Sequence, residues 1–349
     1  MSKYYGNIIA SVGFNKYKKH MTKLKLILLS VVILALIAAG VFFFVIQKPG
    51  EQSNQKLIFK MGYQNVIGNL PIYVAQENGW LETDKWKIEL IQMASSNQVN
   101  DALLTHQIDF SGQMGVFVPL LTQISNPDQI KIFATMDITK EHPVDGIVVK
   151  SSSDIQNLSD LRSKKVGVYP GVSATNQLKL LLQKQNIDSS SIEFVPLAPN
   201  LQFQALASGS IDALFSYEPL VTNVLEKGDY RQVFGSVFAE VYNHSPGGVW
   251  VVTTKTASEH PGETKEITQM FQKAYEYTEK NQTTSREIAQ QRFDLSESVA
   301  KKVPLSKTVF LSEIKAEVIQ GYADLLFDLG ELKQRVKTDD MIYKSEPKS

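Results

Sequence analysis

Four small hydroxyl residues stand at the start of two stretches with helical spacing. Ser95 and Ser96 precede the first stretch, and Ser173 and Thr175 precede the second. The first turn of a helix has unpaired N–H groups and the positive end of the helix dipole, so it attracts anionic groups. A Ser or Thr at this position also caps a helix without any ligand. Both interpretations stay open: a site for a sulfonate, nitrate or carboxylate group, or ordinary N-capping.

A carboxylate and an aromatic ring follow another strand-like run. Glu218 would repel an anion but would pair with an amine or an amino-pyrimidine. It could equally cap the next helix or form a salt bridge. Its neighbour Tyr217 offers a stacking surface to an aromatic or cationic ligand, or else belongs to the core. The charge of the ligand is therefore the open chemical question.

The elements that position these residues alternate from residue 57 onward. Short β-like runs alternate with amphipathic helical stretches, which predicts βαβ units and a mainly parallel sheet. In such α/β folds, ligands bind beyond the carboxyl ends of the strands. Loops 64–69, 95–97, 112–115, 171–175 and 217–219 have that position. They supply the predicted ligand-binding residues, which are Gln64, Asn65, Asn69, Ser95, Ser96, Asn97, Gln113, Met114, Ser173, Ala174, Thr175, Tyr217 and Glu218.

A short internal repeat suggests two lobes on one plan. Ala102-Leu103 followed by Ile108-Asp109 recurs, with the same spacing, as Ala205-Leu206 followed by Ile211-Asp212. Strand-like runs at 57–63, 86–92, 108–111 and 130–136 belong to the first lobe, and those at 146–150, 166–169, 192–196 and 211–216 to the second. A run at 248–254 and helices at 264–280 and 311–332 return to the first lobe. We expect lobe 1 at 57–140 plus 245–349, lobe 2 at 141–244, and a hinge where the chain crosses twice.

The N-terminal segment predicts a membrane anchor. Residues 26–46 carry no charge and are long enough, at about 1.5 Å per residue, to cross a hydrocarbon core of about 30 Å. Six Lys residues precede this run, so residues 1–25 should stay in the cytoplasm and the folded part should be extracytoplasmic. A cleavable signal peptide, with secretion, is the alternative for residues 26–47. Residues 48–56 read as a linker, and Met21 is an alternative start of translation.

Composition excludes several functions. Residues 1–56 hold eight Lys and one acidic residue, Glu51, whereas the remainder has 28 Lys and Arg against 35 Asp and Glu. The acidic body argues against nucleic-acid binding. The chain has no Cys, which excludes disulfides, thiolate metal sites and a lipid-bearing cysteine. Its five His residues show no metal-ligand spacing, and no motif for a catalytic nucleophile or a phosphate loop is present. We expect neither an enzyme nor a bound metal or cofactor.

Several motifs, in order, resemble one family. They are Gly62-Tyr63-Gln64, Leu70-Pro71-Ile72-Tyr73-Val74-Ala75, Asn78-Gly79-Trp80-Leu81-Glu82, Ser95-Ser96-Asn97, the element at 158–167, in which Ser163 replaces a usual Gly, the run Gly171-Val172-Ser173-Ala174-Thr175, and residues 209–219. Together they resemble the substrate-binding proteins of ABC importers for nitrate, sulfonate, taurine and thiamine-pyrimidine precursors. The resemblance implies a two-lobed α/β fold of the type II periplasmic-binding-protein kind, a small polar ligand, and a permease with its ATPase as partner.

Two other functions remain as alternatives. Pyrimidine synthases resemble this chain in scaffold, but they use a cysteine-rich segment and a lysine–histidine site, whereas this chain has no Cys and only five scattered His. A ligand-sensing ectodomain of a receptor would need an effector domain, and the 25 residues before the apolar run are too few for one.

Overall fold

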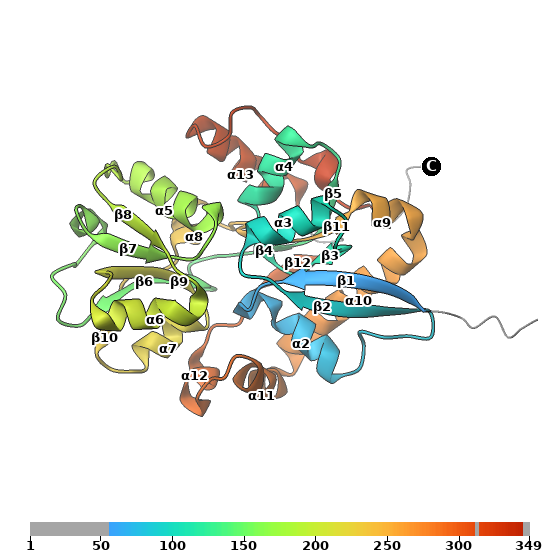
Figure 1. Ribbon diagram of the computed structural model, residues 1–349, viewed down its shortest axis with the longest axis horizontal. Helices are drawn as coiled ribbons and strands as arrows, with labels where there is room; N and C mark the ends of the chain where they lie inside the picture. The colour runs from blue at the N-terminus through green and yellow to red at the C-terminus, as the bar shows by residue number, and fades with distance from the viewer. Residues whose placement is uncertain (1–55, 311–313, 345–349) are drawn as a thin grey trace, which may run out of the picture. The chain divides into compact units, whose positions relative to one another are not determined.

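The computed structural model describes residues 56–310 and 314–344, which belong to one compact unit, Lys56–Ser349. The expected membrane segment at 26–47 lies outside the described residues. Within the described ranges, no helix is both long enough and apolar enough to span a membrane. Two sheets form the framework of this unit, and helices cover them (Figure 1).

The larger sheet has seven strands in the order β12-β5-β11-β3-β1-β2, with β4 paired to β11. Their bounds are β1 (Leu57–Tyr63), β2 (Trp86–Gln92), β3 (Phe110–Ser111), β4 (Met114–Gly115), β5 (Ile130–Met136), β11 (Gly248–Thr253) and β12 (Thr308–Phe310). β1 pairs in parallel with β2 and β3, whereas β11 runs antiparallel to β3, β4 and β5, and β12 antiparallel to β5. The expected mainly parallel sheet is thus mixed, because β5 leads away to the other sheet and β11 returns beside it.

The smaller sheet has five strands in the order β10-β6-β9-β7-β8. They are β6 (Asp145–Lys150), β7 (Lys165–Val168), β8 (Glu193–Pro196), β9 (Ala213–Tyr217) and β10 (Tyr230–Phe234). β7 pairs in parallel with β8 and β9, and β6 lies antiparallel between β9 and β10.

The two copies of the sequence repeat form the same pair of backbone and side-chain hydrogen bonds. Asp109 accepts a hydrogen bond from the backbone N–H of Lys60 at 2.9 Å, and its own N–H donates to the Lys60 carbonyl at 2.8 Å. Asp212 makes the equivalent pair with Lys165, at 2.7 and 2.8 Å. In each sheet the repeat ties the strand after its helix to the strand two places earlier in the chain, β3 to β1 and β9 to β7, so the two sheets share one local plan.

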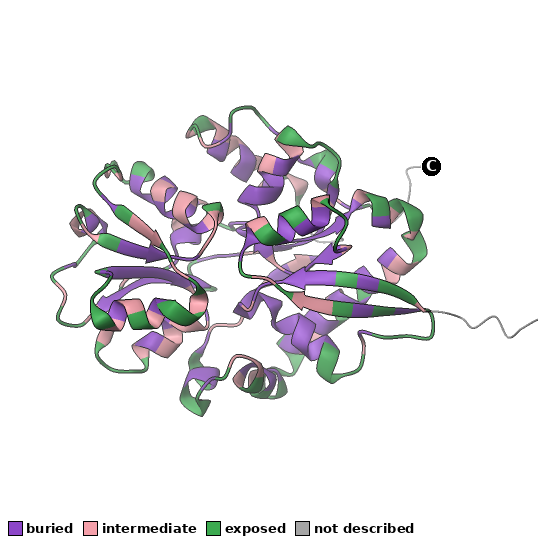
Figure 2. Cartoon of the chain, viewed as in Figure 1, coloured by how far each residue is buried: buried purple, intermediate pink, exposed green. Residues whose placement is uncertain are grey.

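Twelve α-helices are described. They are α2 (Leu70–Glu77), α3 (Ser96–Leu104), α4 (Phe117–Ser125), α5 (Val172–Lys184), α6 (Pro199–Ser208), α7 (Leu220–Leu225), α8 (Val237–Val241), α9 (Thr254–Glu259), α10 (Pro261–Lys280), α11 (Gln282–Arg292), α12 (Glu297–Lys302) and α13 (Ala316–Asp328); short 3-10 turns are η1 (Ile67–Asn69), η2 (Leu158–Leu161) and η3 (Asp339–Met341). Buried side chains follow both sheets and the inner faces of these helices (Figure 2).

Two segments connect the sheets, from β5 to β6 and from α8 to β11. They touch at an antiparallel bridge between Ile138 and Ser245, whose backbones exchange hydrogen bonds of 3.0 and 2.9 Å. Ser245 is the first residue after the predicted lobe boundary at 244/245, and Ile138 lies just before the predicted boundary at 140/141.

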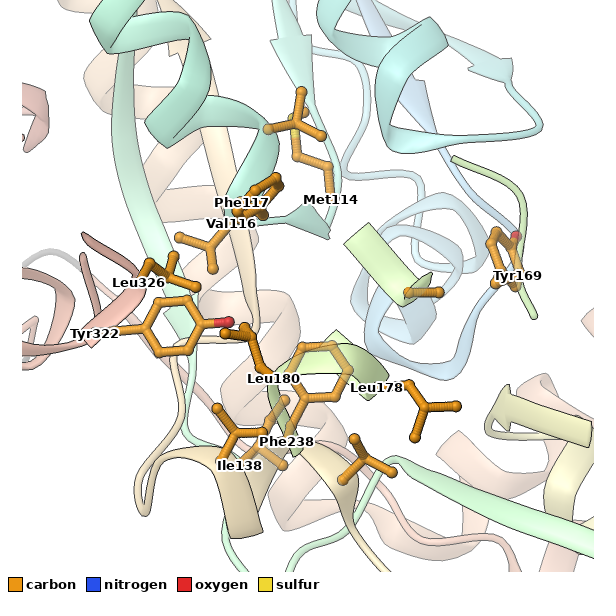
Figure 3. Packing of buried hydrophobic residues seen from close by; sticks show 14 of the residues in the cluster. Met114, Val116, Phe117, Ile138, Tyr169, Leu178, Leu180, Phe238, Tyr322 and Leu326 are labelled. Atoms are coloured by element: carbon orange, nitrogen blue, oxygen red, sulfur yellow. The ribbon is translucent and has the colours of Figure 1, made fainter. Parts of the chain in front are cut away.

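The C-terminal helix α13 contacts both halves of the unit. The chain before it pairs with β5 through β12, and the chain after it returns to β5, where the Tyr343 N–H donates to the Ile132 carbonyl. Between these anchors, the Tyr322 hydroxyl donates to Gln177 of α5 at 2.6 Å. Figure 3 shows Tyr322 and Leu326 packed near Val116 and Leu180. The helix expected at 311–332 is therefore shorter, and it is not confined to the larger sheet.

Candidate ligand-binding site

A cavity lies where loops of both sheets meet. Its free space, including its open mouth, is about 520 Å³. The larger sheet and its loops contribute Gln64, Val66, Ile67, Gly68, Ser96, Gln113, Gly115 and Met136; the connecting segments contribute Ile138, Val144 and Gly247; the smaller sheet and its loops contribute Tyr169, Tyr217, Glu218 and Phe238. Among these described lining residues there is no Lys, Arg or His. The polar groups of the wall are therefore amides, hydroxyls, backbone groups and one carboxylate.

Asn69 holds two of the cavity loops together. Its side chain is fully buried, donates to the Gln64 carbonyl at 2.8 Å and accepts from the Gln113 N–H at 2.6 Å. The side-chain amide of Asn69 thus joins the loop of Gln64 to the loop of Gln113, although Asn69 itself does not line the cavity.

Ser96 connects the loop that contains Gln64 to the strand β4 that contains Gly115. Its hydroxyl donates to Gln64 Oε1 at 2.9 Å and accepts from the Gly115 N–H at 2.9 Å. The Gln64 side chain also hydrogen bonds the Tyr169 hydroxyl, and burial raises the pKa of Tyr169. Gln64 is in this way fixed by residues from both sheets.

The N-terminus of α5 lies against the N-terminus of α3. Asn97 accepts from the Val172 N–H at 3.3 Å, and the Ser173 hydroxyl oxygen is buried without a hydrogen-bond partner in the described part of the chain. A Cβ on Gly115 would lie 2.6 Å from Ser173 Oγ, so only glycine permits this approach. The two helix starts predicted to bind a ligand are brought into direct contact.

Glu218 is buried, with 5% of its surface exposed, and lines the cavity. Its carboxylate accepts from the Thr222 N–H at 3.1 Å and from the Thr222 hydroxyl at 2.9 Å, so it caps α7. Burial raises the pKa of Glu218. Its backbone carbonyl accepts from the Ile67 N–H at 3.1 Å, which joins loops of the two sheets. The Glu218 carboxylate thus caps α7, and the residue also lines the cavity.

A second buried carboxylate, Asp145, lies behind Glu218. It accepts from the Ser236 hydroxyl at 3.0 Å and the Val237 N–H at 2.6 Å at the start of α8. Burial raises the pKa of Asp145 to about 7, the nearby Glu218 charge adds to this rise, and the two hydrogen bonds oppose it. This side of the cavity therefore has acidic groups without a cationic partner among the described residues.

Five predicted residues line the cavity: Gln64, Ser96, Gln113, Tyr217 and Glu218. The others lie beside it. Asn65 accepts from the Tyr73 hydroxyl at 2.7 Å, Ser95 caps α3 through the Gln98 N–H, and Asn97 and Ser173 lie at the contact between α3 and α5. Met114 and Ala174 are core residues, and Thr175 is half-buried on α5 outside the lining.

Sequence reasoning missed the apolar part of the wall. Tyr169, Phe238, Ile138, Met136 and Val144 line the cavity, and all of them are buried. Nothing in the sequence distinguishes them from core residues, because an apolar side chain at a strand end packs equally well on its neighbours or on a ligand. The predicted crossing segments were the one available signal for Ile138 and Val144.

The fold is that of the periplasmic binding proteins. It resembles the alkanesulfonate-binding protein SsuA from Xanthomonas axonopodis pv. citri bound to MOPS, with a TM-score of 0.70 and 21% identity over 82% of this chain and 98% of that one. It also resembles the periplasmic nitrate-binding protein NrtA from Synechocystis PCC 6803, with a TM-score of 0.65 and 13% identity over 82% and 84% of the two chains.

The chain belongs to the NMT1/THI5 like family, whose pattern matches residues 67–285. Among curated proteins it is 25% identical, over 302 residues, to the "Putative aliphatic sulfonates-binding protein" of Bacillus subtilis (strain 168). That similarity covers 84% of this chain and 87% of the relative. In the described residues no group of three or more His, Cys, Asp or Glu side chains could hold a metal ion.

Proposed function

We propose that this protein is the extracytoplasmic solute-binding subunit of an ABC importer and that it delivers a small polar ligand to a permease with its ATPase. The observation that carries the proposal is the cavity between strand-end loops of both sheets, the place where ligands bind in open α/β folds. The similarity to binding proteins for sulfonate and nitrate supports it.

The proposed mechanism is closure of two lobes, 57–140 plus 245–349 and 141–244, over the ligand. The bridge between Ile138 and Ser245 supports a hinge at the connecting segments. A ligand that contacts both walls binds the closed form better and shifts the population toward it. In small-angle scattering, saturating ligand should therefore reduce the fraction of extended molecules. An unchanged scattering curve with bound ligand would contradict closure.

The ligand is proposed to be a sulfonate, taurine, nitrate or a pyrimidine-like molecule. Calorimetric titration of the purified folded part with ethanesulfonate, taurine, nitrate and an amino-pyrimidine tests this directly. Saturable binding of one of them, with the ligand recovered unchanged, supports a transport function. Chemical conversion of the ligand would instead support the enzyme alternative, which the binding-protein relatives do not favour. A sensing ectodomain predicts binding without any effect on uptake in cells.

The mode of attachment is part of the proposal. The apolar run at 26–46 and its Lys-rich flank support an uncleaved N-terminal anchor, with the folded part outside the cytoplasm. Cell fractionation with external protease tests this arrangement. A soluble product that begins near residue 41 or later would show cleavage and contradict the anchor.

A further inference from the structure

We propose that one end of the cavity, formed by Glu218 with Tyr169, Tyr217 and Phe238, binds a positively charged ammonium group of the ligand. This four-residue set is called the acidic aromatic box. The inference rests on the proposed solute-binding function and narrows its ligand to small organic ammonium compounds, including zwitterions. It makes Glu218 the residue that selects such ligands over simple anions.

The carboxylate has unused acceptor capacity inside the cavity. A carboxylate has about four acceptor positions, and Glu218 fills two of them with the Thr222 N–H and hydroxyl. No ion pair of Glu218 occurs within the described residues. The second carboxylate, Asp145, adds negative charge behind it. A buried carboxylate is costly unless a partner compensates its charge, and here a cationic ligand would do so.

Three aromatic rings complete the box. The rings of Tyr169 and Tyr217 lie 5.1 Å apart with a tilt of 41°, and those of Tyr217 and Phe238 lie 6.0 Å apart with a tilt of 49°. All three side chains line the cavity together with Glu218, and Figure 3 shows Phe238 and Tyr169 among the packed residues. The negative face of an aromatic ring attracts a cation, and sets of such rings recognise ammonium groups.

The opposite wall suits a different group. Ser96, at the start of α3, and Gln113 line the cavity there and supply a hydroxyl and a side-chain amide. Such groups accommodate an anionic or neutral polar end of a ligand. A molecule with an ammonium group at one end and an acidic group at the other would match both walls.

One alternative explains the same burial. Glu218 could be protonated and donate a hydrogen bond to an anionic ligand. Glu218→Gln distinguishes the two, because the Gln side chain imitates a protonated Glu in shape and donor capacity but carries no charge. It should preserve the binding of an anion and weaken the binding of an ammonium compound.

The experiment compares two probes that differ in the ammonium group. Taurine and ethanesulfonate are titrated calorimetrically into the wild-type protein, Glu218→Gln and the control Glu259→Gln, which changes an exposed carboxylate on α9. We expect taurine to bind the wild type and the control at least about tenfold more tightly than ethanesulfonate, with a ratio near one in Glu218→Gln. Equal or tighter binding of ethanesulfonate to the wild type, or a ratio unchanged in Glu218→Gln, would overturn the inference.

Failure of the proposed function gives a different result. If neither sulfonate binds, choline and glycine betaine are titrated next; binding that Glu218→Gln abolishes would support the box without sulfonate transport. If no probe binds at all, thermal unfolding of the ligand-free protein decides. An uncompensated Glu218 charge predicts that Glu218→Gln unfolds at a temperature about 2 °C or more above the wild type at pH 8. An equal or lower temperature would overturn the inference.

Discussion

Lys302 of α12 lies 2.6 Å from Glu226, the residue that follows α7, and the Ser298 hydroxyl donates to the same carboxylate at 2.5 Å. α7 follows β9 of the smaller sheet, whereas α12 lies in the segment between β11 and β12 of the larger one. This contact and the contact of α3 with α5 therefore join the two halves at separate places. Both would have to break if the halves moved apart.

Glu226→Gln should favour an open form and weaken ligand binding by a few-fold. The exposed pair contributes a charge attraction that salt screens, so the difference from the wild type should shrink at high ionic strength. Titrations at low and high salt measure the effect. The matched control is Glu297→Gln, which removes the pair of Glu297 with Lys301 inside α12. If the two variants lost equal affinity, the Lys302–Glu226 contact would have no special part in closure.

Gly115→Ala should obstruct the approach of α5 to α3. The new Cβ would lie 2.8 Å from Ser173 Cβ and 2.6 Å from its hydroxyl, both closer than real contacts allow. We expect at least about tenfold weaker ligand binding, the equivalent of about 1.4 kcal/mol. Ser173→Gly in the same chain should restore most of the affinity. Gly262→Ala, where a Cβ would meet nothing, should leave binding unchanged. Absence of rescue would show that Gly115 acts elsewhere.

Asn69→Ala should destabilise the protein by roughly 1 to 3 kcal/mol, because it leaves the Gln113 N–H without its partner and removes one of the two hydrogen bonds to the Gln64 carbonyl. Asn65→Ala loses one hydrogen bond, from the Tyr73 hydroxyl, and should cost only about 1 kcal/mol. Denaturant unfolding measures both. Equal losses would contradict the assignment of Asn69 as the residue that joins the two loops.

The free energy of unfolding should fall between about pH 4 and pH 7 through Asp145. Its pKa is raised from 3.8 to about 7 in the folded state, so the folded protein holds a proton that the unfolded chain releases in this window. Stability from this group is therefore present at low pH and lost as pH rises, and Glu218, whose pKa is also raised, acts in the same direction.

Asp145→Asn removes the titration at that position. It should reduce the decline in stability between about pH 4 and pH 7, measured by denaturant unfolding at each pH. Asp188→Asn is the control, because Asp188 is largely exposed and its pKa is lowered by the bonds from Ser190, which gives the opposite sign. A decline as steep in Asp145→Asn as in the wild type would contradict the role of Asp145.

The framework of the protein was predictable where local pattern decides structure. The predicted runs 57–63, 86–92 and 130–136 coincide with β1, β2 and β5, because their apolar and β-branched residues alternate or cluster over seven residues. β12, with only Thr308–Phe310, has too few residues to show a period. The antiparallel direction of β11 depends on a chain that returns from the other sheet, and no local pattern records this.

Within the site, the polar half was predictable and the apolar half was not. Gln64, Ser96 and Glu218 stand in loops at the carboxyl ends of strands, where topology places a ligand. Tyr169 and Phe238 have the composition of core residues, and their place in the wall depends on how the two halves meet. The role of Asn69 in joining two loops likewise depends on a hydrogen bond from the Gln113 N–H, 44 residues away in the sequence.

If the halves separate as proposed, we expect the position of α13 to limit the rate of ligand capture. Both ends of its segment are tied to β5, yet Tyr322 is buried against α5 and bonded to Gln177. If the halves separated, α13 would have to leave one of them, or the buried ring of Tyr322 would become exposed to water. Entry would then wait on an intramolecular step, so the observed association rate should level off as ligand concentration rises. We therefore expect both slow binding and slow release of the ligand.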